Sequence, residues 1–182
     1  MKIYEIGLDA KYATGDIDRN IFWVEQKTAI WNFDGTRLEK VWYPVKYWIL
    51  DESLEKNEPI GDCVQDIPGD MIVMEQSKIS LLSEFWTNAE ILPLKFDYGD
   101  YKLINICNVV DCVDLEKSKV FRSSKGRILY IKEYSFIKEK LEGHHIFKLN
   151  DYSFRIFVDQ YFVDCITKHK ITGLRFDLVW EG

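Results

Sequence analysis

The chain has 182 residues, of which 47% are hydrophobic and 15% aromatic. This supply of apolar side chains suits one folded domain and excludes wholesale disorder. The formal net charge is −6, with three basic and twelve acidic residues over 51–100 but fourteen basic and eleven acidic residues over 101–182. An acidic surface repels a phosphate backbone, which argues against a nucleic-acid partner, and it attracts basic protein surfaces; the alternative is that the acidic segment is simply a solvated face.

The first residues lack the long apolar run of a signal peptide, and no stretch approaches the roughly 20 apolar residues of a membrane span. We therefore expect a cytoplasmic protein that makes no contact with a membrane. In that compartment cysteines stay reduced. The cysteines are Cys63, Cys107, Cys112 and Cys165.

The first part of the chain predicts short strands and turns. Residues 2–7 alternate like a strand, and apolar runs follow at 21–24 and 30–31. Residues 38–50 are rich in aromatic side chains, and Pro44 predicts an edge strand or a bulge there, since proline cannot donate to a sheet. The acidic residues 51–57 predict a surface loop or a short helix.

The second part predicts hairpins and two helices. Apolar residues at helical spacing indicate a helix over 78–87, with Ser77 as its N-cap, and Asp159 is placed to cap a second helix. A hairpin over 120–131, turning at 123–126, carries a patch of basic residues. The other predicted strands are 60–67, 90–96, 101–110, 146–149, 154–158 and 174–180, and 71–74 is a brief buried run. The strands 90–96 and 101–110 are expected to form a hairpin that turns at 97–100.

These elements predict an α+β fold of mostly antiparallel strands with two or three short helices. We expect a single domain over 1–182, within which 1–70 and 71–182 could form two lobes. Residues 96–118 are central, because an apolar strand there ends in an acidic turn.

No motif in the sequence indicates a metal, nucleotide or other cofactor. Cys107 and Cys112 have the wrong spacing for a zinc site, and His144-His145 has no second cluster nearby. Residues 123–126 lack the glycine spacing of a phosphate-binding loop. Cys165 lies on the apolar face of its predicted helix, where an unactivated thiol is inert.

Asp111 and Asp114 follow a predicted strand end, where acidic side chains often function in catalysis. Aspartates at turns serve equally well as hydrogen-bond acceptors for the backbone, and we favour that structural role. A small hydrolase or transferase that uses these residues, with His144 or His145, stays open as an alternative.

The C-terminal half resembles an immunity-protein family. The pattern YxLxNxxxVVDCxDxxxS over 101–118, with IFKL at 146–149, IFV at 156–158 and ITGLRF at 171–176, is similar to immunity family number eleven of bacterial polymorphic toxin systems, formerly a domain of unknown function. The resemblance covers roughly 71–177. Asp111, Asp114 and Ser118 match its most distinctive positions, and the family-like motif also includes Asn105, Gly173 and Phe176.

The resemblance implies a non-enzymatic antitoxin that binds and neutralises a cognate toxin encoded by a neighbouring gene. Such a protein needs exposed aromatic anchors and complementary charge. The segment 9–70 has no such resemblance, and it combines aromatic and acidic residues. The predicted partner-binding residues are Trp42, Tyr43, Tyr47, Trp48, Asp51, Glu52, Glu55, Glu58, Asp62 and Asp66.

Two alternatives remain at this stage. The aromatic residues of 42–48 could instead fill the core, as most large aromatic side chains do. The protein could also be an adaptor that pairs strands with a partner.

Overall fold

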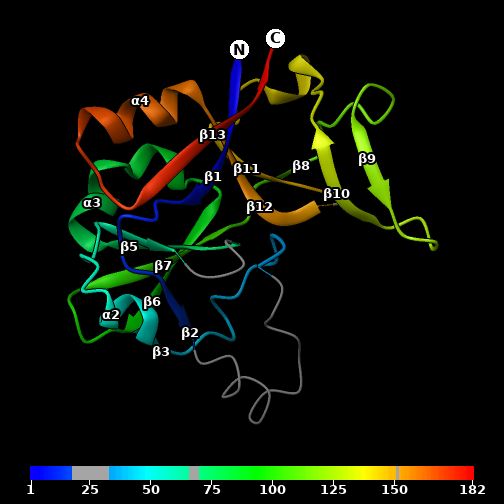
Figure 1. Cartoon of the computed structure of the whole chain (residues 1–182). Coiled ribbons are helices and arrows are strands. Elements are labelled where there is room, and N and C mark those ends of the chain that lie inside the picture. Colours follow the sequence, from blue (N-terminus) through cyan, green and yellow to red (C-terminus); the bar gives the residue numbers. More distant parts are fainter. Residues whose placement is uncertain (18–32, 66–69, 151) are drawn as a thin grey trace.

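The computed structural model describes residues 1–17, 33–65, 70–150 and 152–182. They form two larger sheets and a separate two-stranded ribbon, with helices α3 and α4 on the same side of the molecule (Figure 1). The two chain ends are neighbours, since the backbone N–H of Gly182 donates to the carbonyl oxygen of Met1 at 3.0 Å. Nearly all strand pairs are antiparallel, and the exceptions are β3 with β6 and β8 with β11. The predicted α+β fold is confirmed.

The six-stranded sheet has the order β2-β3-β6-β7-β5-β4. It takes strands from both sides of residue 70, and the β6–β7 hairpin predicted from the turn at 97–100 lies at its centre. Its strands are β2 (Gly15–Ile17), β3 (Val45–Ile49), β4 (Cys63–Gln65), β5 (Ile72–Glu75), β6 (Ala89–Lys95) and β7 (Tyr101–Ile106).

The five-stranded sheet has the order β13-β1-β12-β11-β8, so the first strand of the chain lies between two of the last. Its strands are β1 (Lys2–Leu8), β8 (Val109–Val110), β11 (Ile146–Leu149), β12 (Tyr152–Asp159) and β13 (Leu174–Glu181). The ribbon pairs β9 (Lys119–Arg122) with β10 (Ile128–Glu133), as the predicted hairpin requires.

The helices in the described ranges are short. They are α2 (Asp51–Glu55), α3 (Gln76–Leu81), α4 (Gln160–Lys168) and the 3₁₀ turns η1 (Ser83–Trp86) and η2 (Lys138–Leu141). Asp159 caps α4 as predicted, since its Oδ1 accepts the backbone N–H of Phe162 at 3.0 Å. The prediction of Ser77 as the cap of the preceding helix is wrong. That helix begins two residues earlier, at Gln76, and its N-cap residue Glu75 makes no side-chain hydrogen bond.

Alternation along the strands sends neighbouring side chains into different cores. In β12, Ile156 and Val158 pack between the two larger sheets, under α4, whereas Phe157 packs on the opposite face beneath the ribbon. In β5, Val73 points to a third core formed by the N-terminal strands. Each larger sheet therefore contributes side chains to two cores.

A buried lysine connects the five-stranded sheet to the loops of the N-terminal part. Lys148 of β11 is fully buried, and its ammonium donates to the backbone carbonyls of Phe33 and, at 2.6 Å, Asp70. Hydrogen bonds of this kind are what a buried cation needs.

Two sequence predictions concern the N-terminal part. Pro44 directly precedes β3 rather than interrupting it, and β3 lies inside the sheet, so the predicted edge strand is wrong. The predicted apolar runs at 21–24 and 30–31 lie outside the described residues.

Candidate functional site

The predicted acidic surface is formed by α2 and the turn after it, which we call the acidic face and define as Asp51, Glu52, Glu55 and Glu58. The first three side chains are exposed and Glu58 is half-buried. The helix is held in place from below, because buried Ser53 accepts the backbone N–H of Thr14 at 3.1 Å. The acids therefore point outward on a fixed support.

A hollow of about 180 Å³ lies beside the acidic face. Leu8, Tyr12 and Leu50 contribute its apolar part, and Glu52 and Glu58 contribute charge. A hydrogen bond from Lys56 at 2.7 Å lowers the pKa of Glu52, so that carboxylate is ionised at neutral pH. Lys56 lines the hollow as well and offsets the charge of Glu52.

The aromatic residues predicted beside these acids are less exposed than the prediction requires. Tyr47 is 1% exposed and packs edge-on against Phe96, so its assignment to a partner surface is wrong. The reason is the alternation of β3, which directs Val45, Tyr47 and Ile49 inward. The other three aromatics, Trp42, Tyr43 and Trp48, are half-buried.

Trp42 is fixed by its own contacts. Its indole N–H donates to the carbonyl oxygen of Pro93 at 2.9 Å, and its ring lies 6.4 Å from that of Phe33. Together with the buried Tyr47, this bears out part of the core-packing alternative.

Asp62 has a structural task. Its Oδ2 accepts both the backbone N–H and the hydroxyl of Thr172 at 2.9 Å, and its backbone N–H donates to the Thr172 hydroxyl at 3.0 Å. Lys78 lies 3.4 Å from its other oxygen. The carboxylate therefore holds the start of β4 to the start of β13, and the assignment of Asp62 to a partner surface stays a prediction. Asp66 lies outside the described residues.

The acidic positions of the family-like motif build the base of the ribbon. Asp114 Oδ1 accepts the backbone N–H groups of Glu116 and Lys117 at 3.2 Å each. The Ser118 hydroxyl both accepts from and donates to the backbone of Ser135. These hydrogen bonds between side chains and backbone stabilise turns, as the structural interpretation of the motif predicts.

Asn105 holds a second buried cluster. Its side-chain N–H groups donate to Glu90 and to the carbonyl oxygen of Thr36, both at 2.9 Å. Glu90 also accepts the backbone N–H groups of Leu38 and Glu39 at 2.7 and 3.0 Å. Burial alone would raise the pKa of Glu90, but these hydrogen bonds lower it. The cluster ties the loop before β3 to the central hairpin.

Gly173 and Phe176 complete the motif. Gly173 has φ +96°, and a Cβ there would lie 1.9 Å from the carbonyl oxygen of Cys63. Phe176 packs against Phe162 of α4, with 6.2 Å between the rings. Both positions serve the packing of β13.

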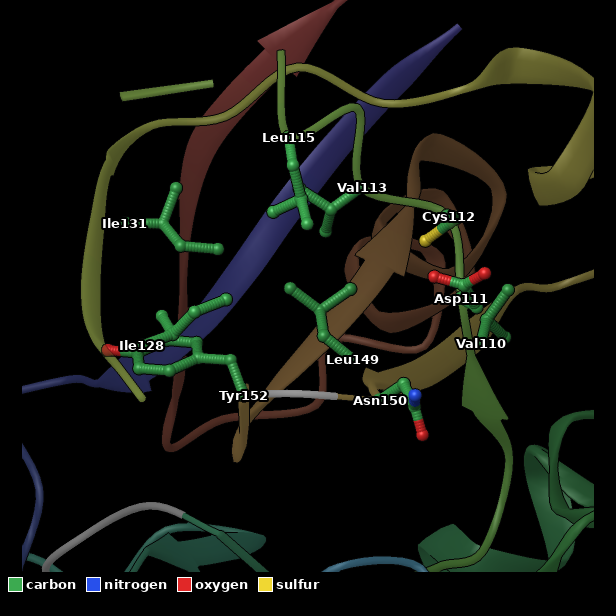
Figure 2. A pocket seen from close by; sticks show the side chains of 10 residues that line it. All are labelled: Val110, Asp111, Cys112, Val113, Leu115, Ile128, Ile131, Leu149, Asn150 and Tyr152. Atoms are coloured by element: carbon green, nitrogen blue, oxygen red, sulfur yellow. The ribbon is translucent and has the colours of Figure 1, made fainter. Parts of the chain in front are cut away.

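The residues of the enzymatic alternative do not share one pocket. Asp111 lines a narrow space of about 20 Å³ between the ribbon and the five-stranded sheet. The other side chains that line this space are mainly apolar (Figure 2). A space of that size holds about one water molecule. His144 and His145 line a separate hollow of about 100 Å³ near η1.

The polar groups of this alternative have other partners. Asp111 forms an exposed ion pair with Lys140 at 3.1 Å, and Lys117 beside Asp114 lowers the pKa of that carboxyl. His145 lies 2.8 Å from Asp159, the cap of α4. Asp114 is thus ionised at neutral pH and cannot serve as a general acid.

The cysteines behave as packed apolar residues. Burial raises the pKa of the Cys112 thiol to about 12 and that of Cys107 to about 11. A thiol with so high a pKa is a weak nucleophile. Among residues 1–17, 33–65, 70–150 and 152–182, no cluster of three metal-binding side chains was found.

The ribbon is the exposed feature that the sequence interpretation did not assign to a partner. Phe121 and Tyr130 are each 45% exposed and Leu129 is 58% exposed. The available signal was apolar residues interleaved with basic ones over 119–133. Taken together, the described residues define an α+β protein whose surfaces are better candidates for function than its pockets.

Comparison with known families finds a match over part of the chain. Residues 95–180 match the immunity protein family Imm11. The match confirms the resemblance recognised from the sequence, and it extends from the end of β6 almost to the end of β13, with the ribbon inside it. No curated protein matches the chain. Within the part of the chain that the structure describes, no helix is long and apolar enough to cross a membrane.

Proposed function

We propose that this protein is an antitoxin that neutralises a cognate bacterial toxin by binding it, without chemistry of its own. The observation that carries the proposal is the match of residues 95–180 to an immunity protein family. The toxin is expected to be encoded by a neighbouring gene, and the complex is expected to form in the cytoplasm.

The site geometry supports binding rather than catalysis. The distinctive acids of the family-like motif hold turns and an ion pair, and the pocket that Asp111 borders has room for about one water molecule. Fixed loops on packed sheets give a rigid scaffold, which lowers the entropic cost of association.

Inhibition by occlusion is tested by co-purification and by growth. Cells expressing the protein together with its neighbouring gene product should survive, and the two proteins should elute as a stoichiometric complex. Rescue of growth without a complex would contradict binding as the mechanism and would favour an enzyme acting on the toxin or its product.

The acidic face remains the interface hypothesis derived from the sequence. It requires a basic toxin surface, and Trp42 and Trp48 would flank the contact. Alanine at Trp42, Trp48 and the exposed acids should then weaken the complex, and an unchanged affinity would remove this face from the interface.

The enzymatic alternative is addressed by substitution of Asp111, Asp114, His144 and His145. Loss of protection by a variant that still folds would favour chemistry. Retained protection would leave binding as the mechanism.

A further inference from the structure

The ribbon β9–β10 projects from the body of the protein as a two-stranded sheet of its own. Neither strand is hydrogen-bonded into the two larger sheets. Figure 1 shows it at the side of the molecule away from α2, with its turn directed outward. A ribbon in this position presents an outer face and two strand edges to a partner.

The inner face of the ribbon is anchored. Ile128 and Ile131 are buried in the core that includes Phe147 and Phe157 of the sheet, and Figure 2 shows both isoleucines facing Leu149. The base is closed by a hydrogen bond from the Asp114 backbone N–H to the Ser135 carbonyl at 2.8 Å. A partner would therefore meet a pre-organised element, which lowers the entropic cost of binding.

The outer face carries an aromatic pair. Phe121 and Tyr130 are opposite each other in the register, and their rings stack with centroids 4.4 Å apart and planes 11° apart. Register shifts on both sides of this pair break the simple alternation of β10, so that Leu129 and Tyr130 are both exposed. Exposed aromatic side chains of this kind are typical anchors of interfaces.

The same element is strongly basic. Residues 119–133 hold five basic residues and one acidic residue, a local charge of +4 in a chain of net charge −6. The one acid, Glu133, pairs with Lys119 at 2.6 Å, and Arg122 donates to the Gly126 carbonyl at 2.8 Å. The remaining cations, Lys125, Arg127 and Lys132, are exposed at the turn and along β10.

We propose that this ribbon docks the toxin, and that the toxin surface it contacts is acidic and contains an apolar recess for Phe121, Leu129 and Tyr130. This inference rests on the proposed antitoxin function and assigns its contact surface. The charge requires an acidic partner, and the exposed aromatic residues require apolar contact as well. The ribbon also lies within the residues that match the immunity family, whereas the acidic face lies outside them.

A protein surface fits these features better than a nucleic acid does. Contacts to the phosphates of a nucleic-acid duplex use cations, but they leave an exposed Phe-Tyr-Leu patch without a partner. The acidic remainder of the chain would repel a long polyanion beyond the ribbon.

The first experiment removes the aromatic pair. Isothermal titration calorimetry would measure the affinity of the purified product of the neighbouring toxin-like gene for wild-type protein and for the double variant F121A/Y130A. The matched control is F154A/Y98A, which truncates a phenylalanine and a tyrosine that are 45% and 50% exposed elsewhere on the surface. We expect the Kd of the ribbon variant to be at least about 30 times that of wild type, and the Kd of the control to lie within about twofold of wild type.

The second experiment reverses charge. The variant K125E/R127E/K132E should associate at least about tenfold more slowly than wild type at low salt, with a smaller difference at high salt. K40E/K95E/K168E changes the net charge equally at exposed positions outside the ribbon and should have little effect. Thermal unfolding of each variant would establish that it folds.

The outcomes separate the two proposals. Failure of wild-type protein to bind or protect overturns the antitoxin function and the ribbon contact with it. A tight wild-type complex that both ribbon variants retain at full affinity overturns the ribbon contact alone. The contact is also overturned if the variants abolish only self-association by light scattering, or only binding to a 20-base-pair DNA duplex.

Discussion

The acidic face and the ribbon are both exposed and both charged, yet they differ in the apolar side chains that accompany the charge. The acidic face presents carboxylates on a helix of five residues, and the aromatic residues near it are half-buried or buried. The ribbon presents cations together with three exposed apolar side chains on a strand pair anchored by a core. Asp and Glu are depleted in the centres of interfaces, whereas Tyr and Arg are enriched there. Charge density alone is therefore a weaker guide to a contact surface than charge combined with exposed aromatic area.

The two surfaces also demand opposite partners. A toxin face that attracts the ribbon is repelled by the acidic face, so charge reversal on the two elements should change the association rate in opposite directions. E52K/E55K is the counterpart of the ribbon reversal, and faster association of this variant would favour the ribbon as the contact. Slower association would favour the acidic face.

The largest expected loss of stability is at Gly173, where the segment before β13 packs against Cys63 of β4. Gly173→Ala introduces a Cβ 1.9 Å from the Cys63 carbonyl oxygen in a backbone conformation with φ +96°. We expect the free energy of unfolding to fall by about 4 kcal/mol, the sum of backbone strain and overpacking. Chemical denaturation would measure it.

A control for this substitution lies at the tip of the ribbon. Gly126 has φ +81°, but a Cβ there would meet no atom within 4 Å. Gly126→Ala should therefore lower the free energy of unfolding only by the strain of a positive φ, about 1 kcal/mol. Equal losses at the two positions would contradict the close packing of Gly173 against Cys63.

The next effect concerns the anchor of the ribbon. Ile131→Ala removes a buried side chain from the core beneath it, and we expect a loss of about 2–3 kcal/mol. If the ribbon holds the toxin, the same variant should also weaken the complex. Hydrogen exchange should show faster exchange in β9 and β10 than in wild type. Unchanged exchange there would show that the ribbon does not depend on this anchor.

Glu90→Gln tests the buried cluster around Asn105. The amide keeps the shape of the side chain but loses a charged acceptor for three hydrogen bonds, so we expect a loss of about 1–3 kcal/mol at neutral pH. Because the folded-state pKa of Glu90 lies below its ordinary value of 4.5, its contribution is fully present above that pH. It is lost as pH falls through the folded-state pKa.

The measurement is denaturant unfolding of both proteins at several pH values. The stability difference between wild type and Glu90→Gln should be constant near neutrality and shrink below about pH 4.5. A difference that grows on acidification would mean that Glu90 is protonated in the folded protein.

The smallest effect is expected at Asp111. Its ion pair with Lys140 is exposed, with 78% of the aspartate side chain accessible, and such pairs contribute about 0–1 kcal/mol. Asp111→Asn should therefore preserve both folding and protection against the toxin. Loss of protection by a folded variant would instead support the enzymatic alternative.

Local sequence patterns predicted the parts of the fold that depend on interactions between residues close in sequence. The hairpin at 97–100, the ribbon turn at 123–126 and the cap at Asp159 all follow from turn and cap residues in sequence. The pairing of β1 between β12 and β13 depends on contacts between the two ends of the chain, which no local pattern encodes.

The candidate site was harder to predict because it also depends on contacts that no local pattern encodes. The sequence does not show that alternation in β3 buries Tyr47, or that Asp62 finds Thr172 more than a hundred residues away. Register shifts in β10 expose Leu129 and Tyr130 together, and regular alternation would have exposed only one of them.

Neutralisation by binding is tested most directly by calorimetric titration of the wild-type protein with the purified product of its neighbouring toxin-like gene, alongside growth of cells that express both. We expect a stoichiometric complex with a Kd of about 10⁻⁸ M or tighter, together with full protection. Protection without a measurable complex would contradict neutralisation by binding. A complex that gives no protection would contradict the antitoxin function itself.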